Sequence, residues 1–170
     1  LEKHEPLAAK MLDEHTEKVM DFKVMKHFAY DTKQFYSTDK WALTGEAGAF
    51  MDPFYSPGID FIAIGNSWIA ELIVRDVSGE NTAFRAMIYD LAHKELLKGW
   101  NNLYKNMYGV FGKTQIMLMK TIWDWASYWA IPNVIFINNG YTDIDFLKQF
   151  ASPDAGIGPR FSKLNERMQE

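Results

Sequence analysis

The stretch 41-WALTGEAGAFMDPFYSPGID-60 decides how this chain is interpreted. It joins a short apolar run, 40–45, to a loop of small, aromatic and proline residues, and Pro57 and Gly58 precede a long apolar segment, 59–77. A short apolar run bounded by turn residues is typical of a buried strand. Proline at a first helical position is typical of a helix start. The stretch therefore predicts a strand, a tight loop and the N-terminus of a buried helix.

A loop in this position is suited to bind anions and the polar edges of ligands. The first backbone N–H groups of a helix have no partners within the helix, and the positive end of the helix dipole lies at the same place. Gly45 and Gly48 would let the backbone approach a ligand, while Pro53 and Pro57 would fix the shape of the loop. Glu46 could accept hydrogen bonds from sugar hydroxyls. On spacing alone, an ordinary strand-to-helix loop without a ligand stays an alternative.

The rest of the sequence predicts an α+β chain that is mainly helical. Upstream of the loop, the pattern favours one short helix and then two or three strands, over 7–22, 26–36 and 40–45. Downstream it predicts only helices, over 59–77, 80–112 with a bend at Gly99, 114–130, 143–150 and 160–168, with a loop at 152–159. So few strands make an incomplete sheet. We therefore expect 1–78 to be the C-terminal piece of a larger α/β domain and 79–170 to be a helical C-terminal region.

Composition narrows the class of protein. Of the 170 residues, 48% are hydrophobic and 24% are charged, which is typical of a globular chain. The net charge of −4 and the lack of a basic run argue against nucleic-acid binding. The absence of cysteine excludes disulfides, thiolate nucleophiles and thiolate metal sites. With no leader pattern and no uninterrupted apolar stretch of about 20 residues, we expect a cytoplasmic protein without a membrane span.

Two further groups of residues are candidates for sites. Asp90 and His93 are spaced three apart, as in a helix-bundle metal centre, but the chain has no Glu-x-x-His pair and we expect no metal. Six aromatic residues of the downstream helices fall at helical spacings: Trp100, Tyr104, Tyr108, Trp123, Trp125 and Trp129. They predict either interhelical core or the wall of a pocket for an aromatic or apolar substrate, or for a partner.

The run 44-TGEAGAFMDPFYSPGID-60 resembles the second FAD-binding motif of the flavin-dependent halogenases and related flavoprotein monooxygenases. That motif reads Gly-Asp-Ala-Ala-Gly-Phe-x-Asp-Pro, then aromatic residues, Ser-Ser/Thr-Gly and a long apolar helix. This chain supplies, in matching order, Gly45, Ala47, Phe50, Asp52, Pro53, Phe54, Ser56 and Gly58. The aromatic run 123-WDWASYW-129 is also similar to the C-terminal region of that family, but this part is less diagnostic.

The resemblance implies an FAD cofactor and names the residues that would contact it: Gly45, Glu46, Ala47, Pro53, Gly58 and Ile59. Glu46 stands where the family has the aspartate that binds the ribose. Pro53 would lie near the isoalloxazine ring. Backbone N–H groups of Gly58 and Ile59 would lie beside the N1–C2 edge, where negative charge gathers on reduction. Pro57 stands at a step that helps the halogenases hold chloride, and it has no N–H to offer.

The resemblance leads to a first functional hypothesis. The chain would be the C-terminal part of an FAD-dependent, halogenase- or monooxygenase-like oxidoreductase that acts with reduced flavin and O2 on an organic, aromatic or apolar substrate. No Gly-x-Gly-x-x-Gly unit is present, so the partner would be the N-terminal FAD-binding half of the same protein. The catalytic residues stay unknown. The isolated chain is expected to be inactive and to self-associate.

A second hypothesis comes from another class of protein. The chain would be a non-catalytic helical binding or interaction module with an aromatic groove, and its flavin-like loop would be a remnant. The two hypotheses differ in the requirement for flavin.

Overall fold

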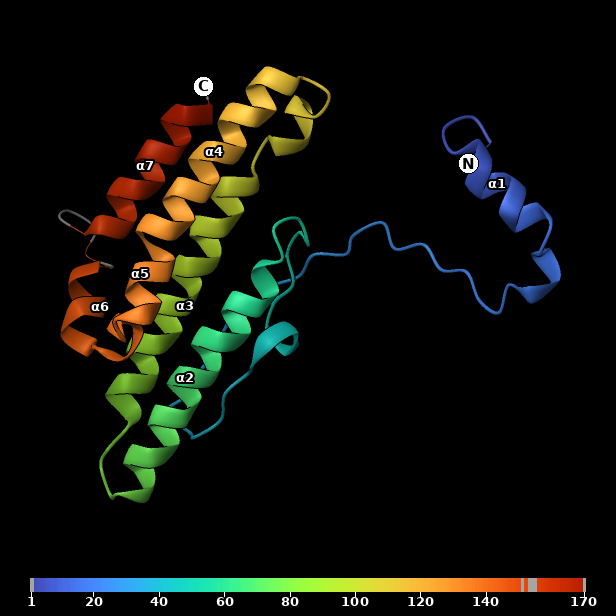
Figure 1. The fold of residues 1–170 in the computed structure, drawn as a ribbon. Coiled ribbons are helices and arrows are strands. Elements are labelled where there is room, and N and C mark those ends of the chain that lie inside the picture. The colour runs from blue at the N-terminus through green and yellow to red at the C-terminus, as the bar shows by residue number, and fades with distance from the viewer. Residues whose placement is uncertain (1, 151, 153–155, 170) are drawn as a thin grey trace.

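A computed structural model of the protein describes residues 2–150, 152 and 156–169. The helices of the described residues are α1 Pro6–Asp13, η1 Thr16–Lys18, η2 Gly45–Ala47, α2 Pro57–Val77, α3 Ala83–Tyr104, η3 Met107–Val110, α4 Thr114–Ala130, α5 Pro132–Ile137, η4 Gly140–Thr142, α6 Ile144–Phe150 and α7 Ile157–Gln169, where η marks a short 3-10 helix. Figure 1 shows α2 to α7 gathered in one helical body, with α1 apart from it at the end of an extended segment. Within the body, α3 contacts α2, α6 and α7.

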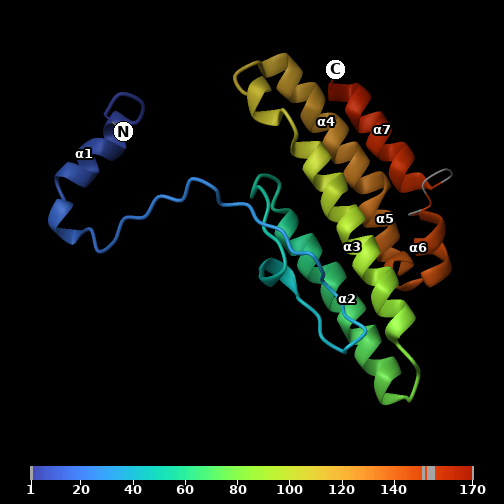
Figure 2. The same cartoon turned by 180° about the vertical axis from the view of Figure 1, so that it is seen from behind.

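The expected α+β class is wrong, because the described residues contain no strand that could complete an α/β FAD-binding domain. The segments predicted as strands, 26–36 and 40–45, are extended chain beside α2, as the view from behind shows (Figure 2). Two isolated antiparallel bridges pair Tyr30 with Phe50 and Tyr36 with Ala42. An alternating sequence forms a strand only when a neighbouring strand accepts its backbone hydrogen bonds, and the described chain offers none.

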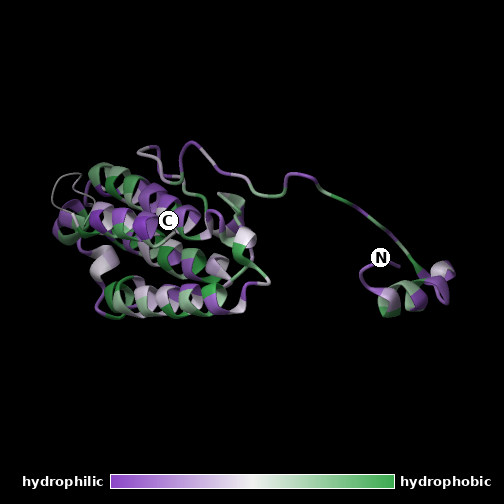
Figure 3. Cartoon of the chain, turned by 90° about the horizontal axis from the view of Figure 1, so that it is seen from above, coloured by the Kyte–Doolittle hydropathy of each residue, from purple (hydrophilic) through white to green (hydrophobic). Residues whose placement is uncertain are grey.

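The first helix is shorter than the sequence predicts. The pattern predicted a helix over 7–22, but α1 ends at Asp13, and the chain is extended from Val19 onward. Met20 is 99% exposed and Phe22 is also exposed. No packed surface supports a longer helix there, and short helices without tertiary support are marginal in water. Figure 3 shows apolar residues along this extended segment as well as on the helical body.

Helix α2 confirms the predicted helix at 59–77, but only one of its faces is buried. The buried face includes Phe61, Ile64 and Trp68 and meets α3, η2 and η4. On the other side Ile73 and Val77 are exposed, so the helix predicted to be buried is buried on one face only. By length and composition, α2 is the one helix of the described chain that could cross a membrane.

An aromatic cluster holds α2 against α3. Trp68 and Tyr89 are fully buried, and their ring centroids lie 5.3 Å apart in a stacked arrangement. Tyr36, from the extended chain, meets both rings edge-on and is 1% exposed. The Trp68 indole N–H donates to the backbone carbonyl of Tyr141. A Cβ at Gly65 would lie 3.4 Å from the Tyr36 hydroxyl, so α2 and the extended chain pack closely at this glycine.

The downstream helices agree with the sequence except at two places. The predicted helix over 80–112 is α3 followed by η3, and it is continuous through Gly99. It breaks instead after Tyr104, where Asn106 adopts the left-handed conformation with φ of 62°. Pro132 does end α4, as expected, but it also begins the short helix α5, which the sequence did not predict.

Helices α4, α6 and α7 confirm the helices expected at 114–130, 143–150 and 160–168. The loop expected at 152–159 is wrong at its end, because residues 157–159 already belong to α7, and its residues 153–155 lie outside the described residues.

Candidate functional site

Two neighbouring cavities meet at the N-terminus of α2. The smaller one, of about 250 Å³, lies beside the loop that precedes α2. The larger one, of about 600 Å³, lies between the start of α2 and helices α3, α4 and α7. Ser56 and Ile59 line both cavities. The first turn of α2 is therefore a wall that the two cavities share.

Tyrosine hydroxyls fix the loop before α2. Tyr104, at the end of α3, donates to the backbone carbonyl of Phe54, and Tyr108 donates to the carboxylate of Asp52. Asp52 also accepts the backbone N–H of Phe54 at 2.8 Å. Burial raises the pKa of the Tyr104 hydroxyl, so it stays protonated and keeps donating. The sequence predicted Tyr104 and Tyr108 as core or pocket wall, and it gave no signal for their contacts with the loop.

The entry into α2 has an unusual backbone. Tyr55 and Ser56 both have positive φ, of 65° and 56°, which is uncommon for residues other than glycine. The Ser56 side chain does not cap the helix, so it satisfies none of the first backbone N–H groups of α2. A Cβ added at Gly58 would meet only Glu46, whose Oε1 would lie 3.7 Å away. The start of α2 thus leaves space beside Gly58.

The smaller cavity gathers five of the six residues that the sequence predicted to bind a cofactor: Gly45, Glu46, Pro53, Gly58 and Ile59. Ala47, the sixth, is not part of its lining. The Ile59 side chain is 71% exposed, so it stands at the open side of the cavity.

Gly45 and Gly48 have roles in packing that need no ligand. Gly45 has a φ of +55°, and a Cβ there would come within 2.9 Å of the Ile62 side chain. A Cβ at Gly48 would come within 2.6 Å of the Phe35 ring. Packing within the chain therefore accounts for both glycines, whereas the space beside Gly58 is open.

The smaller cavity also contains a buried histidine. The His93 ring stacks on Phe35 with centroids 3.8 Å apart, and its Nδ1 lies 3.3 Å from the Tyr36 hydroxyl. Burial lowers the pKa of His93 to about 4, so the ring is neutral at neutral pH. Its sequence neighbour Asp90 pairs with Lys94 at 2.6 Å and accepts the backbone N–H of Phe35. Among the described residues, no three His, Asp or Glu side chains gather as metal ligands.

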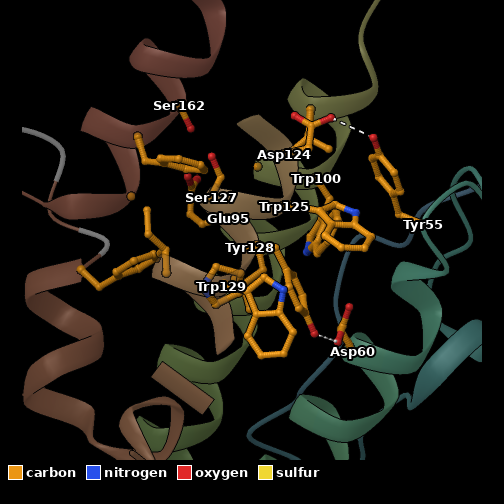
Figure 4. Close-up of a pocket in the computed structure, with 18 of the residues that line it drawn as sticks. Tyr55, Asp60, Glu95, Trp100, Asp124, Trp125, Ser127, Tyr128, Trp129 and Ser162 are labelled. Atoms are coloured by element: carbon orange, nitrogen blue, oxygen red, sulfur yellow. Dashed lines mark hydrogen bonds between the residues drawn. The ribbon is translucent and has the colours of Figure 1, made fainter. Parts of the chain in front are cut away.

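The larger cavity has an aromatic wall. Trp100 of α3 and Trp125, Tyr128 and Trp129 of α4 converge on it, and Tyr55 of the loop reaches it from the other side (Figure 4). The three tryptophans are thus part of a pocket wall. Trp123 is not, because its indole N–H donates to Asn165 at 2.7 Å between α4 and α7.

Two aspartates stand in this wall in different electrostatic surroundings. Asp124 is 3% exposed, accepts from Lys120 at 2.7 Å, and accepts from the Tyr55 hydroxyl at 3.3 Å. Asp60, in the first turn of α2, accepts only from the Tyr128 hydroxyl, at 2.9 Å, among the contacts of the described residues. Burial raises the pKa of both carboxyls, and for Asp124 the Lys120 ammonium partly offsets this effect.

Comparison with known proteins gives one informative similarity. Over 133 residues, 77% of this chain, the sequence is 26% identical to a flavin-dependent halogenase of Dictyostelium discoideum. The chain spans 22% of the length of that protein. No protein-family model matches the chain, and no solved structure matches it. The chain is therefore similar to part of a flavin-dependent halogenase, and the comparison gives neither a substrate nor a mechanism.

Proposed function

We propose that this chain is the C-terminal part of an FAD-dependent oxidoreductase of the halogenase- or monooxygenase-like kind. The observation that carries the proposal is the meeting of two cavities at one helix start. One contains Gly45, Glu46, Pro53, Gly58 and Ile59, and the other is an aromatic chamber that shares Ile59 with it. The similarity to a flavin-dependent halogenase supports a flavin as the cofactor.

The residues at the start of α2 fit the polar edge of a flavin. No side chain caps the start of α2, which carries the positive end of the helix dipole, and Gly58 in its first turn has open space beside it. A helix N-terminus stabilises a negative charge by roughly 0.3–2 kcal/mol, and this favours the reduced form of a flavin held there. Bound reduced FAD would supply electrons to O2 for the oxygenation or halogenation of an organic substrate.

The size of the smaller cavity supports an FAD site that is completed by another part of the protein. Its volume of about 250 Å³ lies below the range of roughly 300–1,000 Å³ that is typical of pockets for complete ligands. We infer that the rest of the FAD lies against the N-terminal half of the same protein, which also covers the exposed apolar side of α2. Glu46 would accept hydrogen bonds from the ribose, and the aromatic chamber would hold the substrate away from water. Without the upstream half, we expect the chain to be inactive and to self-associate through the uncovered surface.

A flavin titration tests the proposal. We expect FAD to bind when the upstream half is supplied and to bind weakly or not at all to this chain alone.

In the complete protein, Glu46→Gln removes a charged acceptor worth about 1.5–3 kcal/mol and should weaken FAD binding roughly ten- to a hundredfold. Glu166→Gln, on an exposed position of α7, is the matched control and should have no effect. Equal affinities for these two variants would remove Glu46 from the site.

The alternative function is a helical binding module that needs no flavin. The aromatic chamber supports it, because its walls come from the described helices without any cofactor. Absence of FAD binding in both the isolated chain and the complete protein would favour this alternative over the oxidoreductase.

A further inference from the structure

The larger cavity combines aromatic walls with acidic groups. Asp60, Glu95 and Asp124 line it, and none of its described lining residues is Lys, Arg or His. Lys120, outside the lining, neutralises Asp124 at 2.7 Å. Glu95 stands half-exposed, and the Lys98 ammonium lies 3.8 Å from its carboxylate. The surface that a ligand would meet is therefore negative.

Asp60 is the carboxylate in the cavity without a cationic partner. It is half-buried in the first turn of α2, and in the described part of the chain its side chain accepts one hydrogen bond, from Tyr128 at 2.9 Å. The positive end of α2 stabilises this carboxylate in part, and an ammonium group placed beside it would add the ion pair that no described side chain supplies.

Tyr141 supplies an independent observation in the same cavity. It is 2% exposed, lines the cavity, and its hydroxyl has no hydrogen-bond partner among the described residues. Burial raises the pKa of this hydroxyl, and the charges of Asp60 and Tyr128, which line the same cavity, add to the effect. Buried polar atoms are rarely left unpaired in folded proteins, so this hydroxyl is available to hydrogen-bond a ligand or a water molecule in the cavity.

The tryptophans provide the remaining contacts. Trp125 and Trp129 line the cavity and are 62% and 59% exposed, and Trp100 stands beside them (Figure 4). The face of an aromatic ring carries negative charge and attracts organic cations, with tryptophan the strongest of the three aromatic side chains. The same faces give an apolar ligand body a large contact area.

We propose that the larger cavity binds an organic cation, in which an ammonium group lies against Asp60 and an aromatic or other apolar body lies among the tryptophans. That this cation is the substrate of an oxidoreductase rests on the proposed function. That the cavity binds such a cation rests on the cavity alone. An anionic ligand would face carboxylates with no cation in the lining. A neutral apolar ligand would offer no counter-charge to Asp60 and no hydrogen bond to the Tyr141 hydroxyl.

Calorimetry with three probes of matched size tests the charge preference. The complete chain is titrated at neutral pH with phenethylammonium, phenethyl alcohol and phenylacetate. We expect the ammonium probe to bind at least about tenfold more tightly than the alcohol, and the carboxylate probe to bind most weakly. Asp60→Asn should reduce the affinity for the ammonium probe roughly tenfold and leave that for the alcohol within about twofold. Asp39→Asn, at an exposed turn, removes the same charge elsewhere and should change neither.

Three outcomes would overturn the inference. They are equal affinities for the ammonium and alcohol probes, no binding of any of the three probes, and equal losses of affinity in the two variants. The comparison of probes on the unaltered chain keeps the test decisive even if Asp60→Asn fails to fold. FAD binding by the complete protein without an ammonium preference would contradict this inference alone. An ammonium preference without FAD binding would contradict the proposed function alone.

Discussion

Acidification should destabilise the fold through His93. Burial between Phe35 and Phe61 lowers the pKa of its ring from 6.5 to about 4. The unfolded chain therefore takes up a proton near pH 6.5, while the folded chain resists until about pH 4. Stability from this group is complete above pH 6.5 and falls as the pH drops toward 4. At 1.36 kcal/mol per pKa unit, the loss amounts to about 3 kcal/mol.

Urea unfolding across this pH range measures the effect. Asp60 and Asp124 act in the opposite direction, because burial raises the pKa of each and protonation then favours the folded state. The test is therefore the difference between variants. His93→Gln removes the titrating group, and its free energy of unfolding should fall by about 3 kcal/mol less than that of the unaltered chain. His27→Gln, at an exposed position, is the control and should follow the unaltered chain. If His93→Gln also follows it, the buried neutral histidine is not the cause.

Two further predictions concern stability. Lys120→Met leaves Asp124 buried without its counter-charge and should lower the free energy of unfolding in urea by about 3–5 kcal/mol. Adding Asp124→Leu to this variant should recover most of the loss. If the single variant is as stable as the double variant, the ion pair has no structural role. Gly48→Ala drives a methyl group to 2.6 Å from a buried ring and should cost about 1–3 kcal/mol in thermal unfolding, while Gly109→Ala, with no atom within 4 Å, should be nearly neutral. Equal melting temperatures for the two glycine variants would contradict the packing role of Gly48.

Local sequence patterns predicted most of the helices correctly. They predicted the strands wrongly, because a strand needs a partner strand that local patterns do not reveal. The segments 59–77 and 114–130 are long and apolar at helical spacing, and both are helices. The alternating segment 26–36 has the composition of a strand, but no neighbouring strand pairs with it in the described chain. Strand formation depends on such partners more than on intrinsic preference. The short helix α5 has a local signal as well, because Pro132 suits the first turn of a helix, but six residues are too few to show a helical pattern.

The residues that line the smaller cavity could be predicted from the sequence better than those of the larger one, because most of them lie closer together in the chain. Gly45, Glu46 and Gly58 lie close in sequence around one helix start, so their convergence follows from local geometry. The group of Asp60, Tyr128 and Tyr141 assembles from three separate elements, and no spacing in the sequence specifies it. One signal was available: Asp60 is a charged residue near the start of an otherwise apolar segment. The helix end favours an acidic residue in this position, so the spacing alone does not distinguish a functional Asp60 from a structural one.

The wall formed by Ser56 and Ile59 has a thermodynamic consequence. Occupants of the two cavities would both touch this helical turn, whose backbone starts from two residues of positive φ. Whatever factor the first occupant imposes on the dissociation constant of the second, the second must impose on the first. Heterotropic linkage across this turn is therefore reciprocal, and measuring it in one direction gives its value in the other.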